Sequence, residues 1–362
     1  MKKIVKGYML LILPFFIVSS CIEVNQNNEV IEDNPNIILL IGDGMGLSQL
    51  SAAFYYGNTE PYFARFKEIG FINTSSAKHK ITDSGAGATA FACGVKTYSG
   101  AVGLNTDSLE IPNLVEVLSG IGYNTGVIST SSVTHATPAC FYAHVKSRAM
   151  QDEIASQLVD SEIDFFAGGG SNYFINRKDS TNLYPKLEKK GFLINTDIES
   201  VKPDADYKYG FLLAKDGMPT MLANRGDFLP NYTQFALEYF TQSEESFFLM
   251  VEGSQIDWAG HDNNAEYLIA ELLDFDRTVG VALDYAKLKG NTLVIVLADH
   301  ETGGFTLAPN DGDYSTIKPA FATTGHSTTL IPVLAYGTGA NNFKGIYQNN
   351  DIYNKILDLT KK

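Results

Sequence analysis

The 362-residue chain has little of several features that mark special classes of protein. Its three cysteines are too few for a disulfide framework, and no internal repeat or low-complexity segment indicates a solenoid. Beyond the N-terminus no run of eighteen or more apolar residues occurs, so we expect no membrane span in the mature chain. Basic residues are also scarce, with 27 Lys and Arg against 41 Asp and Glu. The resulting formal charge of −14 argues against nucleic-acid binding through the phosphate backbone.

The first twenty residues do not look like part of a fold. Three lysines precede an apolar run, residues 9–18, that is too short to cross a bilayer. This order is typical of a secretory signal. Cys21 follows small residues directly, and this resembles the lipobox of bacterial lipoproteins, which implies cleavage before Cys21 and a lipid on its thiol. An ordinary secretory signal with an incidental cysteine is the alternative.

The domain organisation follows from this reading. We expect residues 1–20 to be a signal peptide, residues 21–35 a polar, Asn-rich linker, and residues 36–362 one catalytic domain. The protein is then exported and anchored on the periplasmic or cell-surface side of a bacterial membrane. Its only membrane contact is the lipid on Cys21.

Three continuous apolar runs end in residues that bind metals. Residues 36–42 are followed by Asp43, residues 247–251 by Glu252, and residues 292–298 by Asp299-His300. Apolar runs without alternation are typical of parallel strands covered on both faces. Strands and helices alternate along the whole chain, which predicts a three-layer αβα fold with a central, mostly parallel sheet. Because the carboxyl ends of parallel strands lie along one edge, these residues are expected to converge there.

Further candidate ligands follow nearby motifs. Asp257 and His261 are four residues apart, so one helical turn points both at the same ion, and His326 precedes a later strand. Converging carboxylates repel one another unless cations lie between them. Mixed histidine and carboxylate sets suit zinc, whereas oxygen sets suit magnesium. Each residue alone has a plainer explanation, as a helix cap or a hydrogen-bonded polar group, but together they predict a polynuclear metal site.

Ser84 begins a stretch of small, helix-compatible residues that extends to Cys93. The start of a helix presents unpaired N–H groups and the positive end of the dipole, so an anion binds there and a serine hydroxyl is easier to deprotonate. Asp83-Ser84 is also an ordinary N-cap pattern. Cys93 and Cys140, the cysteines left after Cys21, either form one disulfide or stay as two buried thiols.

Residues 171–229 give a weak pattern. A short Lys-rich helix and edge strands are expected there, in either an accessory cap or a connecting region. No residue in this segment indicates chemistry.

The motifs, taken together and in this order, closely resemble the alkaline phosphatase family. They run from residue 36 to about residue 337. Because eight separated motifs coincide, the resemblance is specific. The motifs are Gly42-Asp43-Gly44, Thr82-Asp83-Ser84-Gly85-Ala86, residues 94–98, Ala136-Thr137-Pro138, Arg148, Glu252-Gly253 with Asp257 and His261, Asp299-His300, and Gly325-His326.

The resemblance implies hydrolysis of small-molecule phosphate monoesters with two Zn2+ ions and a third metal, usually Mg2+. Ser84 is then the nucleophile that forms a phosphoserine, and Arg148 clamps two phosphoryl oxygens. Asp83 is placed to orient Arg148. The metal sites that the resemblance implies are Asp257, His261 and His326 for the first zinc, Asp43, Asp299 and His300 for the second, and Asp43, Thr137 and Glu252 for the third metal.

Some positions depart from well-known bacterial members. Those members have Asp and Lys where this chain has His135 and Trp258, and the chain resembles a branch with His and Trp there. His135 either contacts the third metal or hydrogen-bonds to its ligands, and both readings stay open. Thr302 stands where many members have a histidine that supports the ligands, so metal affinity is expected to differ. The segment between His300 and His326 is short, so the oligomeric state is not carried over.

Two other functions compete with a phosphomonoesterase. A phosphodiesterase of the same superfamily is disfavoured by Arg148, because two non-bridging oxygens of a monoester dianion suit such a clamp best. A phosphate-binding lipoprotein without turnover would use the same helix start and metals. The presence of Ser84 argues against it.

Overall fold

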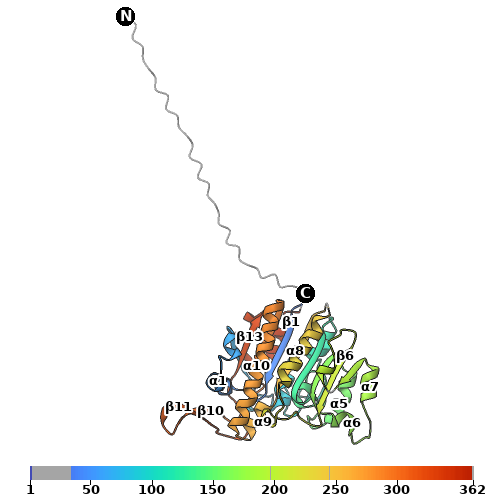
Figure 1. The fold of residues 1–362 in the computed structure, drawn as a ribbon, viewed down its shortest axis with the longest axis horizontal. Coiled ribbons are helices and arrows are strands. Elements are labelled where there is room, and N and C mark those ends of the chain that lie inside the picture. The colour runs from blue at the N-terminus through green and yellow to red at the C-terminus, as the bar shows by residue number, and fades with distance from the viewer. Residues whose placement is uncertain (2–33, 196, 244, 361–362) are drawn as a thin grey trace. The chain divides into compact units, whose positions relative to one another are not determined.

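A central sheet of ten strands organises the computed structural model, which describes residues 34–360 apart from residues 196 and 244, together with Met1 (Figure 1). The expected signal peptide, Cys21 and nearly all of the expected linker lie outside the described residues. Every neighbouring pair in the sheet is parallel except those that involve β13. This confirms the predicted, mostly parallel sheet. The strands, in spatial order, are β14 (Gly345–Gln348), β2 (Glu68–Asn73), β13 (Ile331–Gly337), β8 (Thr292–Leu297), β1 (Asn36–Gly42), β7 (Phe247–Gly253), β3 (Asn124–Ser132), β4 (Phe165–Gly169), β6 (Lys208–Ala214) and β5 (Phe192–Asn195).

The three apolar runs of the sequence form the middle of this sheet. β1 lies between β8 and β7, with Leu39 opposite Ile295 on one side and Met250 on the other. Residues 37–41 of β1 are fully buried because helices cover both faces. The carboxyl ends of these strands therefore lie side by side at one edge.

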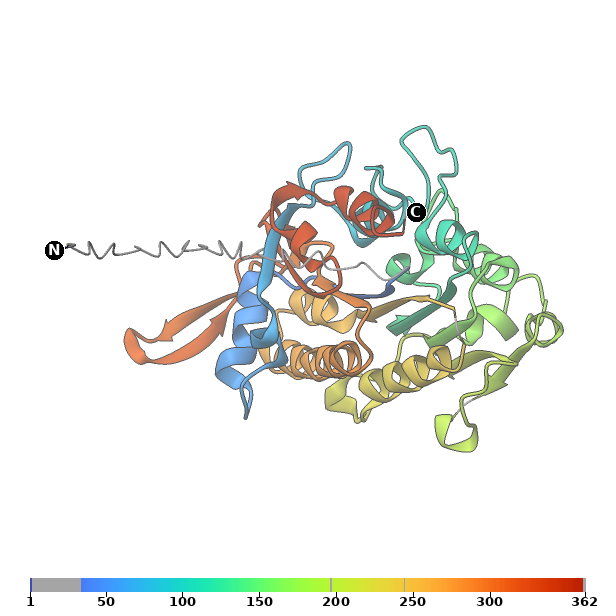
Figure 2. The ribbon, with the colours of Figure 1, turned by 90° about the horizontal axis from the view of Figure 1, so that it is seen from above.

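Helices pack on both faces and make the three predicted layers (Figure 2). On one face lie α1 (Leu47–Tyr56), α8 (Phe228–Thr241) and α10 (Ala265–Lys289). The other face carries α2 (Ser84–Cys93), α4 (Ala136–Ala139) and α11 (Asp351–Leu357), with α2 packed against both of the others. The remaining α-helices are α3 (Leu114–Ser119), α5 (Gln151–Asp160), α6 (Asn172–Ile175), α7 (Tyr184–Lys189) and α9 (Gln255–His261). None of the described helices is long and apolar enough to cross a membrane.

The weakly patterned segment, residues 171–229, extends the sheet. It contains the short helix α7 and the strands β5 and β6, and β5 is the edge strand beyond β6. The expected short helix is confirmed, but only β5 is an edge strand, because β6 is paired on both sides. Its last part returns to the carboxyl edge, where the Met218 N–H donates to the Thr130 carbonyl at 3.1 Å.

The antiparallel direction of β13 decides where His326 lies. β13 pairs with β8 in the opposite sense, so its first residues lie at the edge where β8 ends. The two-residue strands β9 (Glu301–Thr302) and β12 (His326–Ser327) pair with each other just before it. Between them the hairpin of β10 (Thr306–Asn310) and β11 (Asp313–Ala320) projects away from the sheet (Figure 1). His326 thus reaches the same edge as His300.

Candidate metal centre

Three groups of ligand-type side chains meet at the carboxyl edge of the sheet. Within each group one ligand atom per residue lies within 4.8 Å of the others. We name them group one (Asp257, His261, His326), group two (Asp43, Asp299, His300) and group three (Asp43, His135, Glu252). Asp43 belongs to both group two and group three. The structure thus brings together all of the predicted metal-binding side chains, with Thr137 beside group three on α4.

Group one combines helix α9 with strand β12. Asp257 and His261 lie one turn apart on α9, as their spacing predicts. His261 Nδ1 donates to the Thr324 carbonyl at 2.6 Å, and His326 Nδ1 donates to the Thr82 carbonyl at 2.8 Å. Because carbonyls only accept hydrogen bonds, both rings carry their proton on Nδ1. The two Nε2 lone pairs then face each other at 3.1 Å, an arrangement that a cation between them stabilises.

Group two is completely buried. Asp43, Asp299 and His300 have no exposed surface, and His300 Nε2 lies 3.5 Å from Asp43 Oδ1 and 3.2 Å from Asp299 Oδ2. Burial, followed by the charge of Asp299, raises the pKa of Asp43 well above its usual range. Burial also raises the pKa of Asp299 and lowers the pKa of His300 to about 3. Carboxylates buried so close together beside a neutral imidazole fit a divalent cation.

Group three contains buried oxygen atoms without partners. Glu252 Oε1, Asp43 Oδ2 and the hydroxyl of Thr137 make no hydrogen bond of normal geometry. Unpaired buried oxygens are costly, and a hard cation satisfies them. Burial raises the pKa of Glu252. The Ser129 hydroxyl donates a hydrogen bond to Glu252 Oε2 and partly opposes this rise. These oxygen ligands suit magnesium.

His135, a member of group three, is the N-cap residue of α4. Its Nε2 accepts a hydrogen bond from Arg148 Nη2 at 3.0 Å, while its Nδ1 is buried without a partner. Burial and then the Arg148 charge lower the pKa of His135 to about 3, so the ring is neutral. Trp258 packs edge-on against the imidazole, with 6.0 Å between ring centroids. The indole also fills the space above Gly217, where an added Cβ would come within 2.6 Å of it.

Ser84 opens helix α2 next to group two. Its Oγ lies 3.4 Å from His300 Nε2, and its side chain is buried. Asp83 caps the helix, because its Oδ1 accepts from the Ala86 N–H at 3.1 Å. An added Cβ at Gly87 would lie 3.0 Å from the Cβ of Asp299, which explains the small residue there. The N-cap interpretation of Asp83-Ser84 is confirmed, and the Ser84 hydroxyl also lies beside the ligand-type side chains of group two.

Arg148 approaches the same helix start from a loop. Its Nη1 donates to Asp83 Oδ2 at 3.3 Å, and its backbone N–H donates to the Gly100 carbonyl at 2.7 Å. Asp83 Oδ2 also accepts from the Gly100 N–H at 2.9 Å. Asp83 thus fixes both the guanidinium and the loop that holds it. The Arg148 guanidinium and the Ser84 hydroxyl therefore lie close to each other at the start of α2.

Sequence reasoning missed a hydroxyl cluster around Glu252. Ser129 donates to Glu252 Oε2 and contacts the Ser254 hydroxyl at 2.9 Å, while Ser131 lies 3.4 Å from the same carboxylate oxygen. The signal in the sequence was the run of hydroxyl-bearing residues at the end of β3, residues 129–132, three of which are serines. Serines are common at strand ends, so the run did not stand out. The close packing of Gly217 against Trp258 was also missed.

The two remaining histidines and the cysteines have structural surroundings. His144 Nδ1 donates to the Gly103 carbonyl at 2.8 Å, and its Nε2 lies 3.1 Å from Glu116 Oε1. His79 is exposed near Ser99 at 3.4 Å. Cys93 and Cys140 are both buried and free, which settles the alternative that the sequence left open.

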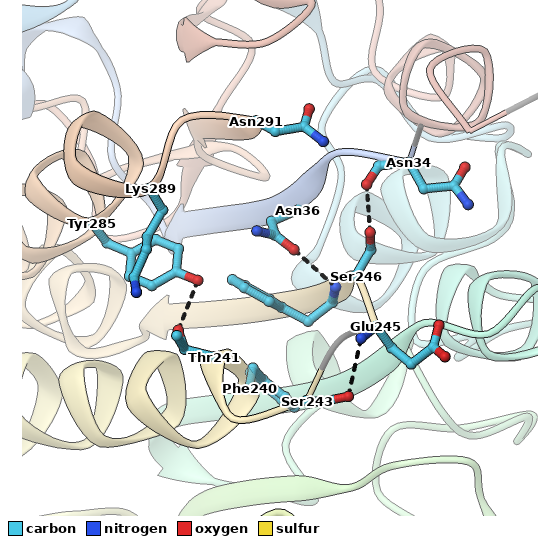
Figure 3. Close-up of a pocket in the computed structure, with 11 residues that line it drawn as sticks. Asn34, Asn36, Phe240, Thr241, Ser243, Glu245, Ser246, Tyr285, Lys289 and Asn291 are labelled. Carbon is cyan, nitrogen blue, oxygen red and sulfur yellow. Dashed lines mark hydrogen bonds between the residues drawn. The ribbon is translucent and has the colours of Figure 1, made fainter. Parts of the chain in front are cut away.

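A separate cavity of about 310 Å³ lies at the opposite edge of the sheet (Figure 3). It is lined where β1, β7 and β8 begin, by residues that include Asn36, Phe247 and Asn291. Its polar groups partly satisfy one another: Tyr285 and Thr241 share a hydroxyl contact at 3.0 Å. Neither Ser84 nor any residue of the three ligand groups lines this cavity.

The fold and the site together define an α/β protein with three groups of metal-ligand side chains beside Ser84 at the carboxyl edge of a mostly parallel sheet. The sequence profile described as alkaline phosphatase matches residues 34–319. The chain belongs to the alkaline phosphatase family. His326 lies just beyond the matched residues and still completes group one.

Known proteins agree with this assignment. The chain is 37% identical to alkaline phosphatase 4 of Bacillus subtilis over 292 residues, which cover 76% of this chain and 63% of that protein. It is 30% identical to the alkaline phosphatase of Escherichia coli, over 89% of this chain and 86% of that one. The chain thus spans somewhat less than two thirds of the length of the Bacillus relative.

A solved structure is similar over nearly its whole length. The alkaline phosphatase of the Antarctic bacterium TAB5 superposes with a TM-score of 0.88 at 51% identity, covering 91% of this chain and 98% of that chain. Structures of that protein with a histidine replaced by Asp or by Glu hold Mg in the site called M3.

Proposed function

We propose that the protein hydrolyses phosphate monoesters to an alcohol and inorganic phosphate through a phosphoserine on Ser84. One observation carries this proposal: the Ser84 hydroxyl contacts His300 of group two while Arg148 reaches the same helix start. A nucleophile, cation ligands and a planar pair of donors are the parts that phosphoryl transfer requires.

We further propose which ions the three groups hold. The histidine and carboxylate sets of groups one and two suit two Zn2+ ions, and the oxygens of Asp43, Thr137 and Glu252 suit one Mg2+. The unpaired buried carboxylate oxygens support this assignment. When bound, these ions neutralise the buildup of negative charge and lower the pKa of the hydroxyl and water that attack phosphorus.

The chain's own residues have separable roles. Arg148 binds two equatorial phosphoryl oxygens, and Asp83 holds its guanidinium in place. The N–H groups at the start of α2 face the same anion. Ser84 displaces the alcohol, and a water then displaces Ser84 from the opposite side. Two in-line displacements predict overall retention of configuration at phosphorus.

Two alternatives differ in observable ways. A phosphodiesterase has a second ester group where Arg148 would otherwise bind an oxygen, so the Arg148–Asp83 pair favours the monoester. A phosphate-binding protein needs no nucleophile, yet Ser84 is buried and placed against His300.

We also propose export and anchoring through the segment outside the described residues. The support is the sequence alone: three lysines, a short apolar run and Cys21 after small residues. Labelling the growing cells with a radioactive fatty acid tests it. Replacing Cys21 by Ser is expected to remove the label and release the protein from the membrane.

The activity is tested with a chromogenic aryl phosphate monoester and the matching bis-aryl diester. Each is assayed with the protein as purified, after chelation, and after Zn2+ and Mg2+ are returned. We expect activity that the metals restore and that is far higher on the monoester. Diester preference would move the function to the phosphodiesterase alternative.

A variant separates catalysis from binding. Ser84→Ala is expected to abolish turnover while keeping zinc content and phosphate binding. Ser51→Ala, on the surface-facing helix α1, is the matched control and should leave both unchanged. If wild-type protein with bound metals turns over neither substrate, the phosphate-binding function becomes the better one.

A further inference from the structure

Thr302 links two of the ligand groups through one hydroxyl. It is fully buried in β9, two residues after His300. Its Oγ1 contacts Asp257 Oδ1 of group one at 2.5 Å and His300 Nδ1 of group two at 3.2 Å. Thr302 is not a member of any of the three groups, but its hydroxyl contacts a member of group one and a member of group two.

Counting protons assigns the direction of both hydrogen bonds. A threonine hydroxyl has one proton to donate, and the carboxylate of Asp257 only accepts. The hydroxyl proton therefore points to Asp257, and the contact with His300 must be a hydrogen bond that Nδ1–H donates to Thr302. His300 then has its lone pair on Nε2, the atom that faces Asp43, Asp299 and Ser84.

The backbone holds this hydroxyl in place. The Thr302 N–H donates to the Gly44 carbonyl at 3.1 Å, and its carbonyl accepts from Gln49 Nε2 at 2.9 Å. An added Cβ at Gly44 would lie 2.8 Å from Thr302 Oγ1, and one at Gly260 would lie 3.0 Å from its Cβ. Close approach at both glycines leaves the side chain little freedom.

We propose that Thr302 is a positioning residue that sets the tautomer of His300 and couples the first and second zinc sites. The proposal rests on the proposed function for its zinc ions. In the relay Asp257–Thr302–His300, the two hydrogen bonds of the Thr302 hydroxyl orient the carboxylate of one site and the imidazole of the other. Groups that orient metal ligands raise metal affinity by about 10- to 100-fold.

Two substitutions test the relay. Thr302→Val keeps the shape and removes the hydroxyl, and Thr302→Ser keeps the hydroxyl. Thr233→Val is the matched control, because Thr233 is equally buried in α8 and its hydroxyl has no hydrogen-bond partner. Zinc affinity is measured by competition with a chromophoric chelator, and the His300 tautomer by the 15N shifts of its ring in metal-free protein.

We expect Thr302→Val to weaken the binding of both zinc ions by about 10- to 100-fold and to lose the Nδ1–H tautomer. Thr302→Ser is expected to retain most of the affinity and the tautomer, and Thr233→Val to bind zinc like the wild type. Wild-type affinity in Thr302→Val, equal losses in Thr302→Ser, or a proton on Nε2 of His300 in the metal-free wild type would each overturn the relay.

The proposed function fails in a different way. If the wild type binds no zinc, both the proposed function and the coupling of zinc sites are overturned. If it binds zinc and hydrolyses monoesters while Thr302→Val is unchanged, the relay alone is wrong.

Discussion

Asp83 joins the cap of helix α2 to Arg148: one carboxylate oxygen accepts from the Ala86 N–H and the other from the guanidinium at 3.3 Å. Asp83, the residue before the proposed nucleophile, therefore has two separable roles: it caps the helix and it positions Arg148. The first concerns stability and the second concerns substrate.

Substitutions at Asp83 separate these jobs. Asn caps helices as well as Asp does but has no charge to hold Arg148, whereas Ala lacks both functions. We expect Asp83→Asn and Asp83→Ala to lower kcat/KM on an aryl monoester by up to about 100-fold, because the clamp is displaced. Both variants lose the acceptor of the Gly100 N–H, but only Asp83→Ala also loses the helix cap, so its free energy of unfolding should be lower than that of Asp83→Asn by about 1 kcal/mol. Full activity in Asp83→Asn would contradict the role given to the ion pair.

His135 is expected to set the metal preference of group three. The substitution His135→Asp replaces a neutral imidazole by a carboxylate and so adds an oxygen ligand, the kind that magnesium prefers. We expect His135→Asp to bind Mg2+ about tenfold tighter or more in calorimetric titrations. His135→Ala is the companion variant: weaker binding of the third ion indicates direct contact, and unchanged binding indicates an action through Arg148. Unchanged Mg2+ affinity in His135→Asp would contradict the prediction.

The pair His144–Glu116 predicts a pH window for stability. Burial alone would lower the pKa of His144, but hydrogen bonds to Glu116 and Gly103 raise it above 6.5. Burial would raise the pKa of Glu116, but hydrogen bonds from His144 and Asn113 lower it below 4.5. The histidine's contribution is complete below pH 6.5 and is lost as pH rises through its folded pKa. The glutamate's is complete above pH 4.5 and is lost as pH falls through its own.

The pair therefore stabilises most between about pH 4.5 and 6.5. His144→Gln should reduce the free energy of unfolding in urea by less than about 1 kcal/mol at pH 5.5, since Glu116 is partly exposed, and by less at pH 8.5. His79→Gln, at an exposed position, is the control. A larger loss at pH 8.5 than at pH 5.5 would reverse the assigned sign.

Arg225 is expected to matter more for stability than any surface cation nearby. Its buried guanidinium lies 2.5 Å from Glu271 and 2.8 Å from Asp274, which are also buried. Arg225→Ala leaves the buried Glu271 without its cationic partner and takes one of two cationic partners from Asp274, and we expect a loss of about 3–5 kcal/mol in urea unfolding. Arg277→Ala removes a half-exposed pair with the same Asp274 and should cost about 0–1 kcal/mol. Equal losses would show that burial of the ion pair is not the cause.

The sequence was sufficient to predict the sheet and the convergence of the ligand-type side chains, because both depend on strong local patterns. Apolar runs that end in Asp43, Glu252 and Asp299 predict buried parallel strands and a shared edge, and the structure has both. The Asp257–His261 spacing likewise predicted one helical turn.

What was missed depends on partners far away in the chain. The hydroxyl of Ser129 carries no spacing signal, and its role appears only when the Glu252 carboxylate of a neighbouring strand lies against it. Thr302 stood out as a departure from the family pattern, but its contacts with Asp257 and His300 had no sign in the sequence. The pairing of Cys93 and Cys140 was undecidable for the same reason, because only packing shows that both stay free. The antiparallel direction of β13 also had no local sign.

The position of β13 has a consequence for how the protein matures. Group one needs His326, which comes almost last in the chain, whereas group two begins with Asp43, which comes almost first. Group two is complete once β1 and β8 pair, whereas group one is complete only when the segment that leads into β13 has also taken its place. Binding of an ion to group one therefore requires the folded sheet, and an ion that binds only the folded state stabilises that state against unfolding. A chain that ends before His326 would therefore lack a complete group one.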